Sequence, residues 1–162
     1  MYYNYLMIDL DVPGCGKLQF DHLVCDVNGT LAFDGELIAG VADRIKTISS
    51  LLKIHLVTAN THGKQDIIDR ELGTNAVILQ AGDEAVQKAD YVEKLDSRKV
   101  IAIGQGANDR LMLKKAGLGI CVLSCEGSFM QTVLAADILV PDILNAFDLI
   151  THPKRLVATL RQ

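Results

Sequence analysis

The chain contains a set of polar residues whose types and positions suit phosphoryl transfer. Asp26 follows a short apolar run, and Thr58 ends a second one. Lys88 lies within a helical pattern, and Asp109 closes a glycine-rich turn that follows a further apolar run. A carboxylate that attacks phosphorus needs a cation to offset the charge it meets, donors for the phosphoryl oxygens and in-line positioning. The set therefore indicates a nucleophile candidate at Asp26, with a hydroxyl and a lysine able to assist it.

Short apolar strands alternate with amphipathic helices through most of the sequence. The predicted strands cover residues 22–26, 54–58, 76–80, 100–103, 119–123 and 138–140. The predicted helices cover residues 40–52, a segment ending near 72, 85–95, 111–116, 127–135 and the C-terminal region. This alternation predicts an α/β fold with a mostly parallel sheet that is covered on both faces.

The candidate residues fall at one edge of that predicted sheet. In a parallel α/β sheet, ligands bind beyond the carboxyl ends of the strands. Asp26, Thr58 and the turn 104–109 each follow a predicted strand directly. We therefore expect these three polar loops to face one crevice.

Two turns lie outside the alternating pattern. Residues 3–9 and 17–20 are β-prone, and the Pro-Gly signal in 12–16 predicts an antiparallel hairpin over the N-terminal extension 1–20. A second turn at 33–36 is expected to hang over the crevice as a flap. With 162 residues, the chain is predicted to be a single domain, 1–162, with its core in 21–162.

The composition argues against several classes of partner. The net charge is -4, and the basic residues are scattered, which is unlike a nucleic-acid-binding or anionic-membrane surface. No apolar run approaches the roughly 18–20 residues that span a bilayer, and the N-terminus does not read as a secretory leader. The sequence predicts a cytoplasmic protein with no membrane and no nucleic-acid partner.

The cysteines and histidines do not form a recognisable ligand pattern. The chain has four cysteines, Cys15, Cys25, Cys121 and Cys125, which we interpret as buried reduced thiols rather than disulfides or a zinc site. Its four histidines share no ligand spacing, and only His62 lies near the predicted crevice. Basic residues within 153–161 are interpreted as the solvated face of a helix that packs through Leu156 and Leu160.

Four ordered motifs resemble those of the haloacid dehalogenase superfamily of aspartate-nucleophile phosphotransferases. Asp26-Val-Asn-Gly-Thr-Leu31 is similar to its first motif, Thr58 to the second, Lys88 to the third and Gly104-Gln-Gly-Ala-Asn-Asp109 to the fourth. The resemblance covers roughly residues 20–160 and looks closest to small soluble P-type ATPase-like proteins. It implies a three-layer, Rossmann-like sandwich and a hydrolase that acts on a small phosphorylated substrate with Mg²⁺.

The resemblance also implies a role for each matching position. Asp26 would become a phosphoaspartate, Thr58 and the amides after it would hold the phosphoryl oxygens, and Lys88 would steady both groups. The implied catalytic residues are Asp26, Asn28, Thr58 and Lys88. The implied phosphate-binding residues are Thr58, Ala59, Asn60 and Lys88. The implied Mg²⁺ ligands are Asp26, Asn28, Gln105 and Asp109.

Two positions depart from the family pattern. The family's phosphatases carry a second Asp, a general acid and base, where this chain has Asn28. General acid–base catalysis contributes about 10²–10⁴-fold, so hydrolysis of the phosphoaspartate is expected to be slow. Gln105 replaces a metal-binding Asp, which removes one negative charge. The alternative to a slow enzyme is a regulatory module that binds phosphate or metal without turnover.

Each candidate also has a simpler structural interpretation. Asp26 and Asn28 are both residue types that stabilise tight turns, and Asp109 is a suitable N-terminal cap for the helix after it. Thr58 is a β-branched residue at a strand end. Lys94 lies in the same predicted helix as Lys88 and is the alternative candidate for the third motif.

The spacing between the motifs leaves no room for an inserted cap domain. About thirty residues separate Asp26 from Thr58, and a similar interval separates Thr58 from Lys88. The crevice is therefore expected to be open unless neighbouring subunits roof it. Capless members of the family often oligomerise, which makes a homo-oligomer a further expectation.

Overall fold

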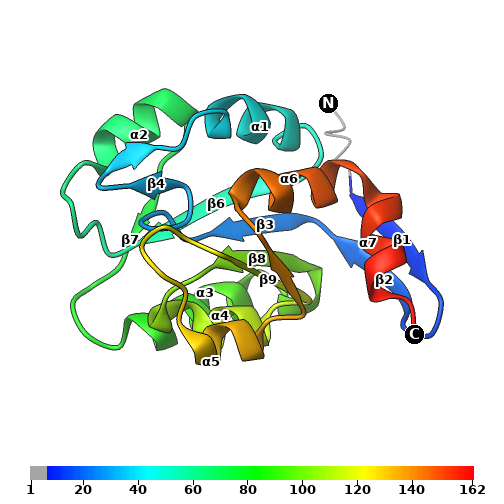
Figure 1. Ribbon diagram of the computed structural model, residues 1–162. Coiled ribbons are helices and arrows are strands. Elements are labelled where there is room, and N and C mark those ends of the chain that lie inside the picture. Colours follow the sequence, from blue (N-terminus) through cyan, green and yellow to red (C-terminus); the bar gives the residue numbers. More distant parts are fainter. Residues whose placement is uncertain (1–6) are drawn as a thin grey trace.

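The computed structural model describes residues 7–162, which form a layered α/β structure (Figure 1). The strands are β1 (Ile8–Val12), β2 (Gly16–Phe20), β3 (His22–Cys25), β4 (Ala32–Phe33), β5 (Glu36–Leu37), β6 (Lys53–Thr58), β7 (Val77–Ile78), β8 (Val100–Gly104), β9 (Leu118–Val122) and β10 (Ile138–Val140). The helices are α1 (Val41–Ile48), α2 (Gln65–Leu72), α3 (Glu84–Lys94), α4 (Arg110–Lys115), α5 (Met130–Ala135), α6 (Ile143–Thr151) and α7 (Pro153–Leu160).

Six strands form a central sheet in the order β10-β9-β8-β3-β6-β7, and all of its neighbours are parallel. This confirms the predicted α/β class. β3 lies between β8 and β6. After β3 the chain first adds β6 and β7 on one side of it, and then crosses over to add β8, β9 and β10 on the other side. Such a reversal of strand order opens a crevice at the carboxyl ends of the strands.

The two faces of the sheet bury different apolar clusters because successive side chains of a strand point to opposite faces. Leu23 and Cys25 of β3 pack in the cluster that includes α1 and α6, whereas Val24 packs in the cluster of α3 and α4. Figure 1 shows α1, α2 and α6 above the sheet and α3, α4 and α5 below it. The result is the three-layer sandwich that the sequence predicts.

β1 and β2 pair as the predicted antiparallel hairpin. The predicted first strand began at residue 3, and residues 3–6 lie outside the described part of the chain. β1 buries alternate residues, and α7 packs beside it with Leu156 fully buried. Figure 1 shows α7 and the hairpin together at one end of the molecule. The prediction that this helix packs through Leu156 and Leu160 is confirmed, since Leu160 is partly buried against the same cluster.

The segment between β3 and α1 contains only the small hairpin β4–β5. Its turn residues Asp34 and Gly35 both have positive φ angles, 49° and 79°, which is the backbone form that tight hairpin turns need. Within residues 7–162, no domain is inserted between β3 and α1 or between β6 and α3. The capless architecture is thus present as predicted.

Several predicted boundaries are wrong. The helix predicted from residue 127 begins at Met130, because Gly127 has φ 88° and Phe129 N–H donates to the Gln105 carbonyl at 2.9 Å instead of starting a helix. The strand predicted over 76–80 is limited to Val77–Ile78, and the helix predicted over 40–52 ends at Ile48.

All four cysteines are free, as predicted, but only two of them are buried. Cys25 and Cys121 lie in the core, whereas Cys15 and Cys125 are exposed because both belong to surface loops. In the part of the chain that is described, no helix has the length and apolar character needed to cross a membrane.

Candidate active site

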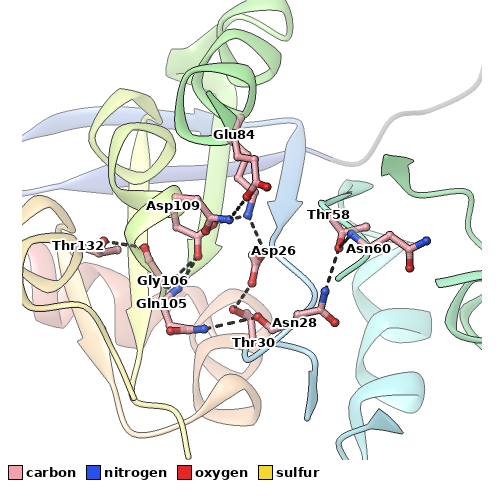
Figure 2. A network of polar contacts seen from close by, with 12 residues as sticks. Asp26, Asn28, Thr30, Thr58, Asn60, Glu84, Gln105, Gly106, Asp109 and Thr132 are labelled. Atoms are coloured by element: carbon pink, nitrogen blue, oxygen red, sulfur yellow. Dashed lines mark hydrogen bonds and ion pairs between the residues drawn. The ribbon is translucent and has the colours of Figure 1, made fainter. Parts of the chain in front are cut away.

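Asp26 is the first residue after β3, and it lies at the carboxyl edge of the sheet. Its N–H donates to the Ile103 carbonyl of β8 at 3.0 Å, so the neighbouring strand fixes its backbone. The residue is almost completely buried, with 5% exposure. Thr30 Oγ1 donates to Asp26 Oδ2 at 2.9 Å, which holds the orientation of the carboxylate (Figure 2).

Lys88 of α3 bridges two carboxylates. Its Nζ donates to Asp26 Oδ1 at 2.6 Å and to Asp109 Oδ1 at 2.7 Å, and its side chain is fully buried. Lys94, the other candidate for the third motif, is exposed near the end of the same helix. A buried lysine is stable only with paired partners, so Lys88 and the two carboxylates form one electrostatic unit.

The charged groups of this unit shift the pKa values of Asp26 and Lys88. The pKa of Asp26 is raised to about 6, because burial and the neighbouring Asp109 carboxylate together outweigh the opposite effects of Lys88 and Thr30. The pKa of Lys88 is raised because the attraction of Asp26 and Asp109 outweighs the effect of burial. Lys88 therefore keeps its positive charge, which is the state needed to offset a phosphoryl group.

Asp109 organises the loop after β8. Its Oδ2 accepts hydrogen bonds from the N–H groups of Gln105 and Gly106, both at 2.9 Å. The sequence offered a side-chain cap of the following helix as an alternative for Asp109, but α4 has no such cap. The carboxylate instead turns back toward the loop, where the two amides and Lys88 engage it. Gly104 is required beside it, because a Cβ there would lie 2.5 Å from Asp109 Cγ.

Thr58 and Asn28 meet across the crevice from β6 and from the loop after β3 (Figure 2). Asn28 Nδ2 donates to Thr58 Oγ1 at 3.3 Å, and the Asn60 N–H donates to the same oxygen at 3.0 Å. Asn60 has φ 53°, and its Oδ1 accepts from the Gln65 N–H at the start of α2. Ala59 lies in this same turn. The predicted phosphate-binding residues 58–60 are therefore brought together at the sheet edge.

Gln105 lies beside the backbone of the Asp26 loop. Its Nε2 donates to the Asn28 carbonyl at 3.5 Å. Gly29 makes this approach possible, since a Cβ on Gly29 would overlap the Gln105 amide and lie 2.7 Å from Glu126 Oε2. The Asn28 carbonyl, the Gln105 amide oxygen and the Asp26 carboxylate are all oxygen donors, the type that Mg²⁺ prefers. The donor types present are therefore compatible with a hard divalent ion, although in this structure Gln105 presents its Nε2 rather than its amide oxygen to the Asn28 carbonyl.

The β4–β5 hairpin is held by contacts with two other segments of the chain. Lys64 Nζ donates to the Asp34 carbonyl at 3.4 Å, and the Asp34 N–H donates to Glu126 Oε1 at 3.5 Å. A Cβ on Gly35 would meet the side chains of Lys64 and His62. A small hairpin is therefore present at the predicted turn, and His62 and Lys64 lie beside its Gly35.

A cavity of about 750 Å³ lies elsewhere, between α1, α2 and the first half of β6. It contains none of the predicted catalytic residues. The convergence of Lys88, Asp26 and Asp109 is the stronger indicator of a reaction site. Burying charged groups costs desolvation free energy, and buried charges with shifted pKa values cluster at functional sites.

Several polar residues of this region were missed from the sequence. Thr30 belongs to the same motif as Asp26, so its hydroxyl was a recognisable donor. Asn108 Nδ2 donates to Glu84 Oε2 at 2.8 Å, and Thr132 Oγ1 donates to the Gly106 carbonyl at 2.8 Å. Both contacts join segments distant in sequence, so local patterns gave no signal for them.

Comparisons with known proteins identify the family of the chain. Residues 83–128, which include Lys88 and the loop of Asp109, match the family of haloacid dehalogenase-like hydrolases. An uncharacterised protein of Methanocaldococcus jannaschii is 46% identical over 84 residues, which are 49% of this chain and 90% of that protein. The chain belongs to the haloacid dehalogenase-like family.

Two further likenesses place this haloacid dehalogenase-like chain within its family. Copper-transporting ATPase 1 of Rhizobium meliloti is 32% identical over 146 residues, 80% of this chain but 17% of the ATPase, so the likeness concerns one part of that transporter. The structure of 3-deoxy-D-manno-octulosonate 8-phosphate phosphatase from Moraxella catarrhalis, solved with magnesium, phosphate and KDO, has a TM-score of 0.61 and 20% identity. It covers 88% of this chain and 94% of its own, which shows a shared fold.

Proposed function

We propose that this protein is a Mg²⁺-dependent phosphohydrolase or phosphotransferase that forms a phosphoaspartate at Asp26. The observation that carries the proposal is the buried Lys88, which contacts Asp26 at 2.6 Å and Asp109 at 2.7 Å at the carboxyl edge of the sheet. A carboxylate fixed by a lysine and a hydroxyl is oriented for attack before substrate arrives, which lowers the cost of positioning.

In the first step, an oxygen of Asp26 attacks phosphorus. A bond forms between this oxygen and phosphorus while the bond between phosphorus and the leaving oxygen breaks. Lys88, the hydroxyl of Thr58 and the amides of Ala59 and Asn60 offset the charge on the phosphoryl oxygens. The leaving oxygen must take a proton from solvent or depart as an anion, because the amide of Asn28 has no acidic proton to give.

In the second step, the oxygen of a water molecule bonds to phosphorus while the bond between phosphorus and the Asp26 oxygen breaks, which releases phosphate and the free Asp26 carboxylate, and the water's proton passes to solvent. A carboxylate at position 28 would accept the proton of this water, and Asn28 cannot do so. We therefore propose that the phosphoaspartate forms more readily than it is hydrolysed. Transfer to an acceptor other than water is compatible with the same site.

A divalent ion, proposed to be Mg²⁺, supplies positive charge that neutralises the phosphoryl oxygens when it is bound. Asp26, the Asn28 carbonyl and the Gln105 amide would hold it. We propose that Asp109 supports this set mainly by ordering the loop, since its two oxygens already receive three hydrogen bonds.

The substrate class follows from the open site and from Asn28. The crevice has no cap domain, and the β4–β5 hairpin covers its mouth only in part. We propose a small phosphorylated compound with a good leaving group, such as an acyl or aryl phosphate, which needs little acid assistance. The sugar-phosphate phosphatase with the same fold supports a small phosphorylated substrate.

The test uses purified protein, Mg²⁺ and two substrates, acetyl phosphate and p-nitrophenyl phosphate. We expect a burst of product followed by slower turnover, with covalent phosphate at Asp26 detected by mass spectrometry of the acid-quenched protein. The variant Asp26→Asn is expected to abolish both, and Asp90→Asn on the outer face of α3 serves as the matched control. Equal turnover by wild type and Asp26→Asn would contradict the proposal.

A second candidate function is a regulatory module that binds phosphate or metal without turnover. The neutral side chains at Asn28 and Gln105 favour it, since both lack the charge that the family uses for hydrolysis. This module would bind phosphate and Mg²⁺ in a calorimetric titration and show no covalent labelling of Asp26. Labelling that is faster than turnover supports the enzyme instead.

A further inference from the structure

The metal site of the proposed function lacks one carboxylate, because Gln105 is neutral. A carboxylate from a different loop, that of Glu126, lies beside Gly29. A Cβ placed on Gly29 would overlap the Gln105 amide and lie 2.7 Å from Glu126 Oε2, so Glu126 and Gln105 approach the same residue. Gly29 directly follows Asn28, whose carbonyl accepts from Gln105 Nε2 at 3.5 Å.

The loop that carries Glu126 is held in place by its own hydrogen bonds. The Glu126 N–H donates to Ser124 Oγ at 3.1 Å, and the Gly127 N–H donates to the Ser124 carbonyl at 2.9 Å. Ser128 Oγ donates to the Val122 carbonyl at the end of β9 at 2.8 Å. The loop is therefore a defined turn on the sheet edge.

The same loop is joined to the loop of Gln105. The Phe129 N–H donates to the Gln105 carbonyl at 2.9 Å, so the two loops share a backbone contact. On the other side, Glu126 Oε1 accepts from the Asp34 N–H at 3.5 Å. The Glu126 carboxylate thus lies between Gly29 and the β4–β5 hairpin.

We propose that Glu126 is a positioning residue that binds Mg²⁺ through the metal's water and restores the negative charge missing at Gln105. Glu126 is exposed, so its carboxylate stays hydrated. Mg²⁺ in proteins keeps several of its waters, and a carboxylate that accepts from such a water strengthens binding without direct ligation. This role of Glu126 rests on the proposed function, because that function assigns Mg²⁺ to Asp26, Asn28 and Gln105.

The experiment measures Mg²⁺ binding to the full chain by isothermal titration calorimetry, without substrate. Glu126→Gln is expected to raise the Kd for Mg²⁺ about tenfold, which is typical of lost second-sphere contacts. Glu71→Gln, an exposed acid on α2, is the matched control and is expected to leave Kd unchanged. Gln105→Asp is expected to tighten binding, and in that background Glu126→Gln is expected to have a smaller effect than in the wild type, since the two carboxylates serve the same need.

Three results would overturn the role of Glu126. These are unchanged Mg²⁺ binding in Glu126→Gln, an equal loss in Glu71→Gln, or an undiminished loss in the Gln105→Asp background. Thermal unfolding of each metal-free variant is measured beside the titrations, and a lowered midpoint for Glu126→Gln would assign it a structural role instead. Covalent phosphate labelling of Asp26 separates this proposal from the proposed function. If Asp26 is labelled normally and Glu126→Gln leaves Mg²⁺ binding unchanged, only the role of Glu126 is refuted. Absent labelling with the expected binding pattern refutes only the proposed function.

Discussion

Lys88→Met is expected to destabilise the fold strongly at neutral pH. The lysine is fully buried and pairs with Asp26 at 2.6 Å and with Asp109 at 2.7 Å. Breaking a buried ion pair by removing one partner costs about 3–5 kcal/mol, because an uncompensated charge is left behind. Here two carboxylates would be left facing each other, so we expect the upper part of that range, about 4–5 kcal/mol.

The pH dependence of this loss has a defined sign. With Lys88 present, burial and Asp109 already raise the pKa of Asp26 to about 6, and removal of the lysine raises it further. A carboxyl group whose folded pKa exceeds its unfolded value near 3.9 contributes stability at low pH, and this contribution is lost as pH rises through the folded pKa. The defect of Lys88→Met is therefore expected to be largest above pH 7 and to shrink toward pH 5.

The assay is urea unfolding of metal-free protein between pH 5 and pH 8, followed by circular dichroism. Lys94→Met, an exposed lysine of the same helix, is the matched control and is expected to change the free energy of unfolding by less than about 0.5 kcal/mol. A loss below about 1 kcal/mol for Lys88→Met, or a loss that does not vary with pH, would refute the electrostatic interpretation of the site.

Three further predictions concern other parts of the molecule. Asn28→Asp is expected to speed hydrolysis of the phosphoaspartate by about 10²–10⁴-fold in a single-turnover chase, and an unchanged rate would contradict the role given to position 28. Gly29→Ala, at φ 81° and with no room for a Cβ, is expected to lower the free energy of unfolding by more than Gly63→Ala, whose φ of 66° is strained but whose surroundings are open. Burial lowers the pKa of His55 to about 4 from 6.5, helped by His22 and Lys53, so its contribution to stability is present above pH 6.5 and is lost as pH falls. His55→Gln is expected to reduce the loss of stability between pH 7 and pH 5 by about 1 kcal/mol, allowing for solvent screening, as measured by urea unfolding.

The fold and the main site residues could be predicted because their signals are local. Apolar strands ending at Asp26 and Thr58 carry the period of buried strands, and parallel pairing then brings both ends to one edge. Lys88 was identified only through the family resemblance, because a lone lysine in a helical pattern is usually exposed; in the structure it is buried beside Ala89 and Val92. A lysine on an apolar stripe requires buried carboxylates as partners.

The remainder of the site depends on contacts between distant segments, which no local pattern encodes. The helix predicted from residue 127 begins at Met130 because the Phe129 amide pairs with Gln105, more than twenty residues earlier in the chain. The carboxylate of Asp109 does not cap α4, because Lys88 and two loop amides engage it. Glu126 belongs to the same loop, so its proximity to Gly29 could not be predicted from the spacing of residues in the sequence.

In the proposed mechanism, the neutral side chains of Asn28 and Gln105 both favour formation of the phosphoaspartate over its hydrolysis. With Asp26, Asp109 and Lys88 ionised, the central unit carries one net negative charge, and neither Asn28 nor Gln105 adds to it. Two unit charges 4 Å apart interact by about 4 kcal/mol at an effective dielectric constant of 20, so each carboxylate absent from this crevice removes a substantial repulsion toward a phosphoryl group. The same absence weakens the hold on Mg²⁺ and removes the base that activates water. In the proposed mechanism, attack by Asp26 is therefore favoured over release of phosphate, and we expect Asn28 and Gln105 together to give a long-lived phosphoaspartate.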